Sequence, residues 1–115
     1  ISLADYCEEV KKAFALDTVK VFGDLKQKVH RVATCPGSGK SDIDQAIAAG
    51  ADVYVTGDIG HHEGIDALAR GLNIIDAGHY GVEHIFIGDM GNYLRAHLLG
   101  VEVIEAPVSH PFTVI

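Results

Sequence analysis

A stretch of 36 residues, from Ala51 to Phe86, concentrates side chains that could bind a metal ion. It contains four of the chain's seven histidines and six of its sixteen acidic residues. Imidazole nitrogens and carboxylate oxygens are ligands for zinc, iron, manganese and nickel, and geometry rather than raw affinity selects among these divalent metals. The alternative is a polar, half-buried surface on which the same side chains bind nothing.

One pair within this stretch has the spacing of metal ligands. His79 and Glu83 are four residues apart, so they share one face of a helix that begins near Gly78. Such a pair is also common by chance, and it then forms a surface contact worth about a few tenths of a kcal/mol. Two ligands do not complete a tetrahedral or octahedral site. The remaining ligands must come from neighbouring side chains, from water, or from another chain or domain.

Two polar motifs follow successive predicted strands. Residues 56–62 come after the apolar run DVYV, and residues 76–83 come after the run NII. Ligands of parallel α/β sheets bind beyond the carboxyl ends of the strands. We therefore expect three further side chains near the pair, as auxiliary ligands or substrate contacts: Asp58, His61 and His62. Asp58 and Asp76 end their strands and could orient a histidine ring.

The segment VATCPGSGKSDID, residues 32–44, has the form of a phosphate-binding loop. A Walker A motif is excluded because Thr34 occupies the position of its first glycine. Gly37, Ser38 and Gly39 still lead into a predicted helix with Ser41 as N-cap, and free backbone N–H groups there would favour an anion. The alternative is a strand-to-helix turn that needs glycine only for its backbone geometry.

The hydrophobic pattern predicts an α/β fold that positions these motifs. A helix begins after Ser2, and alternating segments at 18–23 and 28–35 predict an antiparallel edge pair with a turn at Gly23 and Asp24. Helical stretches ending in glycine then precede apolar runs at 51–56, 72–77 and 101–106. These βα units predict a mainly parallel or mixed sheet with helices on both faces, as a single domain over residues 1–115.

The last part of the chain contains further predicted elements. A helix over 79–99 is expected to break at Gly88 or Gly91, since glycine costs about 1 kcal/mol in a helix interior. The segment 107–115 is expected to be an edge segment or a terminal strand. His84 and His97 are expected on the surface or in an interface, whereas His30 and His110 have no evident ligand partner.

Composition narrows the classes of function. The net charge is −7 and the pI is about 5.3, with no cluster of basic residues, so we expect no nucleic-acid binding. No apolar run approaches the roughly 20 residues of a membrane span, so we expect no membrane insertion. Two cysteines and the absence of a basic leader at the first residues favour reduced thiols and a cytoplasmic location.

The motifs CPGSGKS, GADVYVTGDIGHH and IDAGHYGVEH, in this order, resemble the NGG-interacting factor 3-like family, also called GTP cyclohydrolase type 2 homologues. The resemblance covers essentially the whole chain. It implies a binuclear metal centre in which His79 and Glu83 are ligands. The other ligands of that family lie in an N-terminal half, in a His-His-Pro motif and an Asp-containing motif that are absent here. His61 and His62 are followed by Glu63 instead.

The chain therefore resembles the C-terminal half of a larger metal-binding protein, and its expected partner is the missing N-terminal half. The resemblance also implies a homo-oligomer, a hexameric toroid in full-length family members. A parent hydrolase would use two divalent cations to activate water and hold an anionic substrate, with His61 or His62 assisting proton transfer. We expect this chain alone to be inactive. The alternatives are a non-enzymatic metal-binding or protein-interaction module, or an α/β domain with merely polar histidines.

Overall fold

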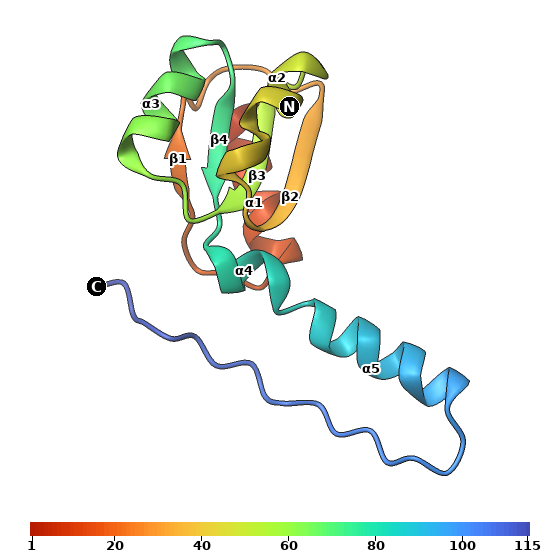
Figure 1. Ribbon diagram of the computed structural model, residues 1–115. Coiled ribbons are helices and arrows are strands. Elements are labelled where there is room, and N and C mark those ends of the chain that lie inside the picture. The colour runs from red at the N-terminus through yellow and green to blue at the C-terminus, as the bar shows by residue number, and fades with distance from the viewer.

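A four-stranded sheet with the order β1-β4-β3-β2 forms the centre of the structure (Figure 1). The structure is a computed structural model that describes all 115 residues. Its elements, in chain order, are α1 (Leu3–Ala13), β1 (Lys20–Phe22), β2 (Val32–Ser38), the 3-10 helix η1 (Lys40–Asp42), α2 (Ile43–Ala48), β3 (Val53–Gly57), α3 (His61–Ala69), β4 (Asn73–Asp76), α4 (His79–Glu83) and α5 (Phe86–His97).

The sheet is mixed, and helices cover both of its faces, which confirms the predicted fold class. Strands β2, β3 and β4 are parallel, and β1 joins β4 in the antiparallel direction. Every residue of β3 and β4 is buried, as expected for central strands covered on both sides. One core cluster joins α1 to one face of the sheet through Leu3, Cys7, Val10, Val53, Val55 and Ile75. The other joins α2 and α3 to the opposite face through Ile43, Ala46, Tyr54, Ala67, Leu72 and Ile74.

Local capping follows the sequence signals. The Ser2 hydroxyl accepts a hydrogen bond from the Asp5 N–H at 3.1 Å and donates one to the Asp5 carboxylate at 2.7 Å, which closes the first turn of α1. Gly50 and Gly71 have φ values of 71° and 87° and directly follow the C-cap residues of α2 and α3, so both occupy the left-handed position that ends a helix. These two predicted C-caps are confirmed. The third is wrong, because α5 ends at His97 with Leu98 as its C-cap, so Gly100 lies beyond the helix end although its φ is also positive, at 73°.

The predicted pairing of the two early strands is wrong. Strands β1 and β2 lie at opposite edges of the sheet, and Gly23 and Asp24 do not form a hairpin turn between them. Residues 25–29 instead run beside the start of α1, where the Leu3 N–H donates to the Gln27 carbonyl at 2.8 Å and the Val29 N–H donates to the Ile1 carbonyl at 3.0 Å. Alternation identifies a half-buried strand, but it does not identify the neighbour with which that strand pairs.

The C-terminal part of the chain leaves the body of the molecule. Helix α5 projects away from the sheet, and residues 98–115 run back alongside it in extended form (Figure 1). We call residues 86–115 the C-terminal arm; it contributes to the elongated dimensions of 53 × 34 × 26 Å. None of the helices, α5 included, has both the length and the apolar composition needed to cross a bilayer.

Two predictions for this region are wrong. The helix breaks at His84 and Ile85, between α4 and α5, and both Gly88 and Gly91 lie inside α5. Gly91 is tolerated there because the tail packs on it: a Cβ atom would lie 3.0 Å from the Glu105 side chain. The runs 101–106 and 107–115 form no strand, because no other strand of the chain lies beside them.

Candidate metal site

The candidate residues lie where the parallel strands β2, β3 and β4 end. Gly37 lies at the end of β2, Asp58 and His79 lie in the segments that follow β3 and β4, and the one-turn helix α4 lies across the strand ends (Figure 1). The parallel order brings segments that are 20 or more residues apart in the sequence to one edge of the sheet. The predicted position beyond the carboxyl ends of the strands thus agrees with the structure.

His79 and Glu83 contact each other on the outer face of α4. Helix α4 begins at His79, directly after Gly78, so the two side chains are one turn apart. The distance from His79 Nε2 to Glu83 Oε2 is 3.1 Å. About half of each side chain is accessible to solvent, 52% for His79 and 44% for Glu83. The pair therefore presents one nitrogen and one oxygen donor toward solvent.

Asp58 contacts the same histidine from the β3 segment. Its carboxylate accepts a hydrogen bond from the His79 N–H at 3.2 Å, and it lies 3.7 Å from His79 Nδ1. Asp58 has a φ of 56°, a left-handed conformation that non-glycine residues adopt rarely. The carboxylate at this position can orient the imidazole ring and select the tautomer that leaves Nε2 free as a ligand.

Gly37 brings the backbone of the β2 segment against the pair. A Cβ atom at this position would lie 2.8 Å from Glu83 Oε1 and 3.3 Å from His79 Nε2. Gly37 also has a φ of 67°, which disfavours any side chain. A side chain at this position would therefore press against the two donor groups. Sequence reasoning had associated Gly37 with an anion and missed its contact with the histidine pair.

Asp76 joins the two segments that carry Asp58 and His79. Its buried carboxylate accepts hydrogen bonds from the N–H groups of Asp58 at 2.9 Å, Ile59 at 2.9 Å and Gly78 at 3.0 Å. The Lys20 ammonium lies 3.5 Å away and offsets its charge. Asp76 therefore fixes backbone rather than orienting a histidine ring, the role that its position at a strand end had suggested.

His61 and His62 occupy the first turn of α3, and both are exposed. Their rings contact each other edge to face at 5.4 Å, and neither forms a hydrogen bond or an ion pair with another side chain. No group of three or more His, Cys, Asp or Glu side chains in the chain is arranged to hold a metal ion. The structure thus brings Asp58, but not His61 or His62, into contact with the pair.

The glycine loop is packed inward. The Gly39 N–H donates to the Thr56 hydroxyl at 3.0 Å, and the Gly39 carbonyl accepts from the Tyr54 hydroxyl at 2.8 Å. Burial raises the pKa of Tyr54, which keeps that hydroxyl protonated as a donor. Ser38 is exposed and belongs to β2, and the 3-10 turn η1 separates the loop from α2, so Ser41 is not an N-cap. Anion binding at Gly37, Ser38 and Gly39 stays a prediction.

His84 is expected on the surface or in an interface, but the structure buries it within the chain. His84 is buried, and its Nε2 atom contacts the Phe14 carbonyl at the end of α1. Its ring lies 5.6 Å from Tyr80 and 5.8 Å from His110, and these three rings hold α4 against the returning tail. His97 is exposed and stacks on Tyr93, as predicted for a surface residue.

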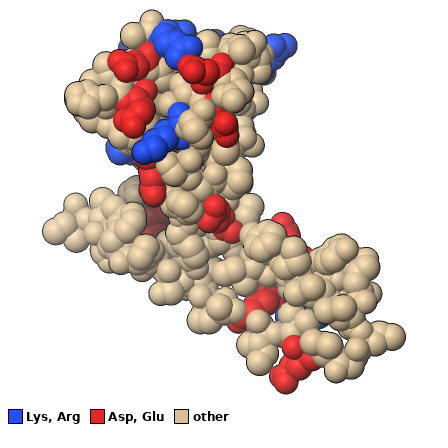
Figure 2. All heavy atoms as spheres, in the orientation of Figure 1, with Lys and Arg blue, Asp and Glu red and all other residues tan.

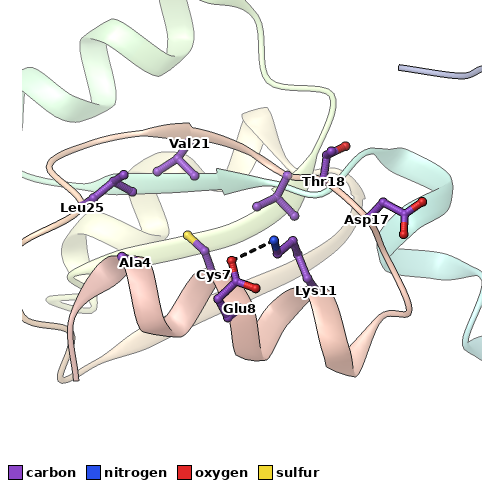
Figure 3. A pocket seen from close by; sticks show the side chains of 9 residues that line it. Ala4, Cys7, Glu8, Lys11, Asp17, Thr18, Val21 and Leu25 are labelled. Atoms are coloured by element: carbon purple, nitrogen blue, oxygen red, sulfur yellow. Dashed lines mark ion pairs between the residues drawn. The ribbon is translucent and has the colours of Figure 1, made fainter. Parts of the chain in front are cut away.

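A separate hollow of about 270 Å³ lies between α1 and the segment that leads into β1. Figure 3 shows Cys7 at its base, with Glu8 and Lys11 joined by a 2.8 Å ion pair on its rim. Burial raises the pKa of the Cys7 thiol, which keeps it protonated and unreactive. Both cysteines are free, as predicted. The hollow contains none of the candidate ligands.

Comparisons with known proteins identify the family. The profile described as Duf34/NIF3 (NGG1p interacting factor 3) matches residues 1–111. A GTP cyclohydrolase 1 type 2 homolog of Listeria monocytogenes is 44% identical over 95 residues, which cover 83% of this chain and 25% of that protein. The homolog from Lactococcus lactis is 42% identical over 102 residues, covering 86% of this chain and 39% of its own length.

Solved structures share the fold over the full length of the chain. A Bacillus cereus protein related to NIF3 superposes with a TM-score of 0.86 at 34% identity, covering 100% of this chain and 33% of that one. A Staphylococcus aureus hypothetical protein gives 0.84 at 32% identity, covering 100% and 40%. The chain thus spans well under half the length of the relatives that it matches. It belongs to the Duf34/NIF3 (NGG1p interacting factor 3) family.

Proposed function

We propose that this chain supplies His79 and Glu83 as two ligands of a divalent metal site in a longer family protein. The observation that carries the proposal is the convergence of one imidazole nitrogen and one carboxylate oxygen, 3.1 Å apart, against backbone at Gly37 where any side chain would meet both groups. A surface ion pair explains the contact between the two side chains, but it gives no reason for the close approach of Gly37.

The separation of the donors fits a small divalent cation. Two ligands about 2.1 Å from a metal, at 90° to 109° from one another, lie roughly 3.0–3.4 Å apart. The distance between His79 Nε2 and Glu83 Oε2 falls in this range. A neutral imidazole with a carboxylate suits zinc, iron, manganese or nickel. The ligand set supports the class of metal and leaves its identity to measurement.

The remaining ligands would come from outside this chain. His79 and Glu83 alone fill two positions, and Asp58 contacts the side of the His79 ring that faces away from Glu83. Asp58 would therefore act through the histidine, by holding its ring and tautomer. The chain covers 25% of one curated relative and 39% of another, so the longer protein has ample further sequence to complete the site.

For the longer protein we propose a metal-dependent hydrolase. Bound divalent cations would supply activated water and electrostatic stabilisation of an anionic substrate. Curated relatives carry the name GTP cyclohydrolase 1 type 2 homolog, which suggests a nucleoside triphosphate as the first substrate to test. Within this chain, His79 and Glu83 would bind the metal, and exposed His61 and His62 would be available to exchange protons with substrate or solvent.

Metal content of the longer protein tests the ligand assignment. We expect His79→Ala and Glu83→Gln to lose close to one equivalent of bound metal, measured by mass spectrometry after dialysis. His97→Ala is the matched control, because His97 is an exposed histidine remote from the pair. Unchanged metal content in both ligand variants would contradict the proposal, and so would an equal loss in the His97 variant.

A non-enzymatic metal-binding or interaction module is the competing function. It is supported by the C-terminal arm, whose side chains are almost all accessible to solvent. Turnover of GTP with added zinc or manganese separates the two functions. Metal-dependent turnover that disappears in His79→Ala would support the hydrolase. Stoichiometric metal without turnover would favour the module.

A further inference from the structure

The C-terminal arm is a helix followed by an extended segment with no sheet to join. Figure 1 shows α5 leaving the body and residues 98–115 returning beside it. Few contacts join the two parts. The Arg95 guanidinium forms a 2.8 Å ion pair with Glu105 and donates to the Val103 carbonyl at 3.3 Å. The Ser109 N–H donates to the Tyr80 hydroxyl at 3.2 Å, which anchors the tail to α4.

The arm carries most of the exposed apolar surface. Of the sixteen large hydrophobic side chains that are exposed, ten lie in the arm: Phe86, Tyr93, Leu98, Leu99, Val101, Ile104, Val108, Phe112, Val114 and Ile115. Leu99 is 95% exposed and Ile104 is 81% exposed. Figure 2 shows this projecting part as mostly uncharged, with a few acidic groups. Concentrated apolar exposure of this kind marks an interaction surface.

The backbone of the tail is also unpaired. No backbone–backbone hydrogen bond involves residues 99–115, and the only backbone groups among them with a protein partner are the Val103 carbonyl and the Ser109 N–H. The segment 101–106 nevertheless has the composition of a strand, with Val101, Val103 and Ile104 among its six residues. Its residues therefore have strand propensity and free hydrogen-bonding groups, and they lack only a neighbouring strand.

Residues 101–106 have two different sides. Glu105 faces α5, where it pairs with Arg95 and packs over Gly91. Ile104, the next residue in the alternation, lies on the other side of the segment and is largely exposed. By the alternation of an extended segment, Glu102 and Ala106 share this free side with Ile104. A segment with one side on its own helix and the other side free has the layout of the outer βα unit of an α/β sheet.

We infer that residues 101–106 form a strand at the edge of a second sheet, provided by polypeptide of the longer family protein that lies outside this chain, with α5 covering one face of that sheet. The solved relatives favour this occupant over a second copy of the chain. The Bacillus cereus structure follows the whole of this chain, arm included, with a TM-score of 0.86. Only 33% of that chain is matched, so polypeptide about twice as long is available to cover the arm.

Hydrogen exchange tests the inference without reference to metal. In the isolated 115-residue chain, we expect the amides of 101–106 to exchange at nearly the rate of an unstructured peptide. In the longer protein, measured at subunit concentrations that maintain its native assembly, they should exchange at least roughly 100-fold more slowly. The comparison uses chelator-treated protein, so a failure of the metal proposal does not affect it.

A substitution at Ile104 tests whether residues 101–106 pack against the added polypeptide. Ile104→Asp should remove the protection of 101–106 in the longer protein, because Ile104 is the large apolar side chain on the free side of the segment and a charge in its place would be costly to bury. It should leave the melting temperature of the isolated chain unchanged, since Ile104 is exposed there. Ile65→Asp, at an exposed apolar position on α3, is the matched control and should preserve the protection.

Two results would overturn the inference. The first is rapid exchange of 101–106 in both proteins, which would mean that no sheet forms. The second is dimerisation of the isolated chain at micromolar concentration, seen by light scattering, with protection of 101–106 that rises with concentration. That result would assign the arm to a second copy of this chain.

Discussion

Replacement of Asp76 by asparagine tests whether one buried carboxylate organises the candidate site. In the native chain, Asp76 Oδ1 accepts from the N–H groups of Asp58 and Gly78, and Oδ2 accepts from that of Ile59. Asparagine retains one oxygen and replaces the other by an NH2 group. With the oxygen at the Oδ1 position, two bonds persist, and the Ile59 N–H then faces another donor.

The magnitude follows from these three bonds. A buried N–H left without an acceptor costs about 1–3 kcal/mol, and the two remaining bonds lose the assistance of a charged acceptor, about 1 kcal/mol together. The neutral amide is less costly to bury than a carboxylate, which offsets a part of this loss. We expect Asp76→Asn to lower the free energy of unfolding by about 2–3 kcal/mol. For a domain of this size, that is a decrease in melting temperature of roughly 10 °C.

Thermal unfolding followed by circular dichroism measures the effect, with Asp66→Asn as the control. Asp66 is exposed on α3, and its side chain forms no hydrogen bond or ion pair, so the same chemical change should shift the melting temperature by less than about 2 °C. In amide NMR spectra, the Asp76 variant should move the signals of Asp58, Ile59 and Gly78 first. Equal melting temperatures for the two variants would refute the reasoning.

Two further predictions concern a matched pair of glycine substitutions and the pH dependence of the stabilisation by Asp52. Gly37→Ala should destabilise the chain by up to about 1 kcal/mol more than Gly71→Ala in thermal unfolding, because both glycines have positive φ but only Gly37 faces close neighbours, the flexible end of Glu83 and the His79 ring; equal losses would refute the crowding at position 37. Hydrogen bonds from the backbone N–H groups of Arg31 and His30 hold the pKa of Asp52 below its usual 3.8. Its stabilisation is therefore complete above the unfolded-state pKa and is lost as pH falls through the lower folded-state value, so the difference in melting temperature between the native chain and Asp52→Asn should shrink below about pH 4.

Much of the fold could be predicted because its signals are local. The N-cap at Ser2, the helix-ending glycines at 50 and 71, and the apolar runs of β3 and β4 each depend on neighbouring residues in the sequence. The order of the strands could not be predicted in the same way. β1 and β2 have similar alternation, and their separation to opposite edges depends on contacts of residues 25–29 with α1. The missing strand at 101–106 illustrates the same limit, since a strand requires a partner.

The parts of the site that lie close together in the sequence could be predicted, and the parts that come from different strands could not. His79 and Glu83 meet because four residues make one helical turn, and sequence spacing captures this. The approach of Gly37 and the clamp by Asp76 join residues from different strands, and only the folded sheet brings them together. The position of His62 and Asp66 on α3 repeats the ligand spacing without producing a contact between them, which shows how little that spacing specifies alone.

Helix α4 is only five residues long, and isolated helices of that length are not stable in water. Its single turn exists because the buried Gly81 and Val82 pack against the body and because Tyr80 accepts a hydrogen bond from the tail. The His79–Glu83 geometry therefore depends on the surrounding fold and not on the sequence of α4 alone. A synthetic peptide of this sequence would not hold the two donors in place, and a transplant into another scaffold would have to carry the surrounding strand ends as well.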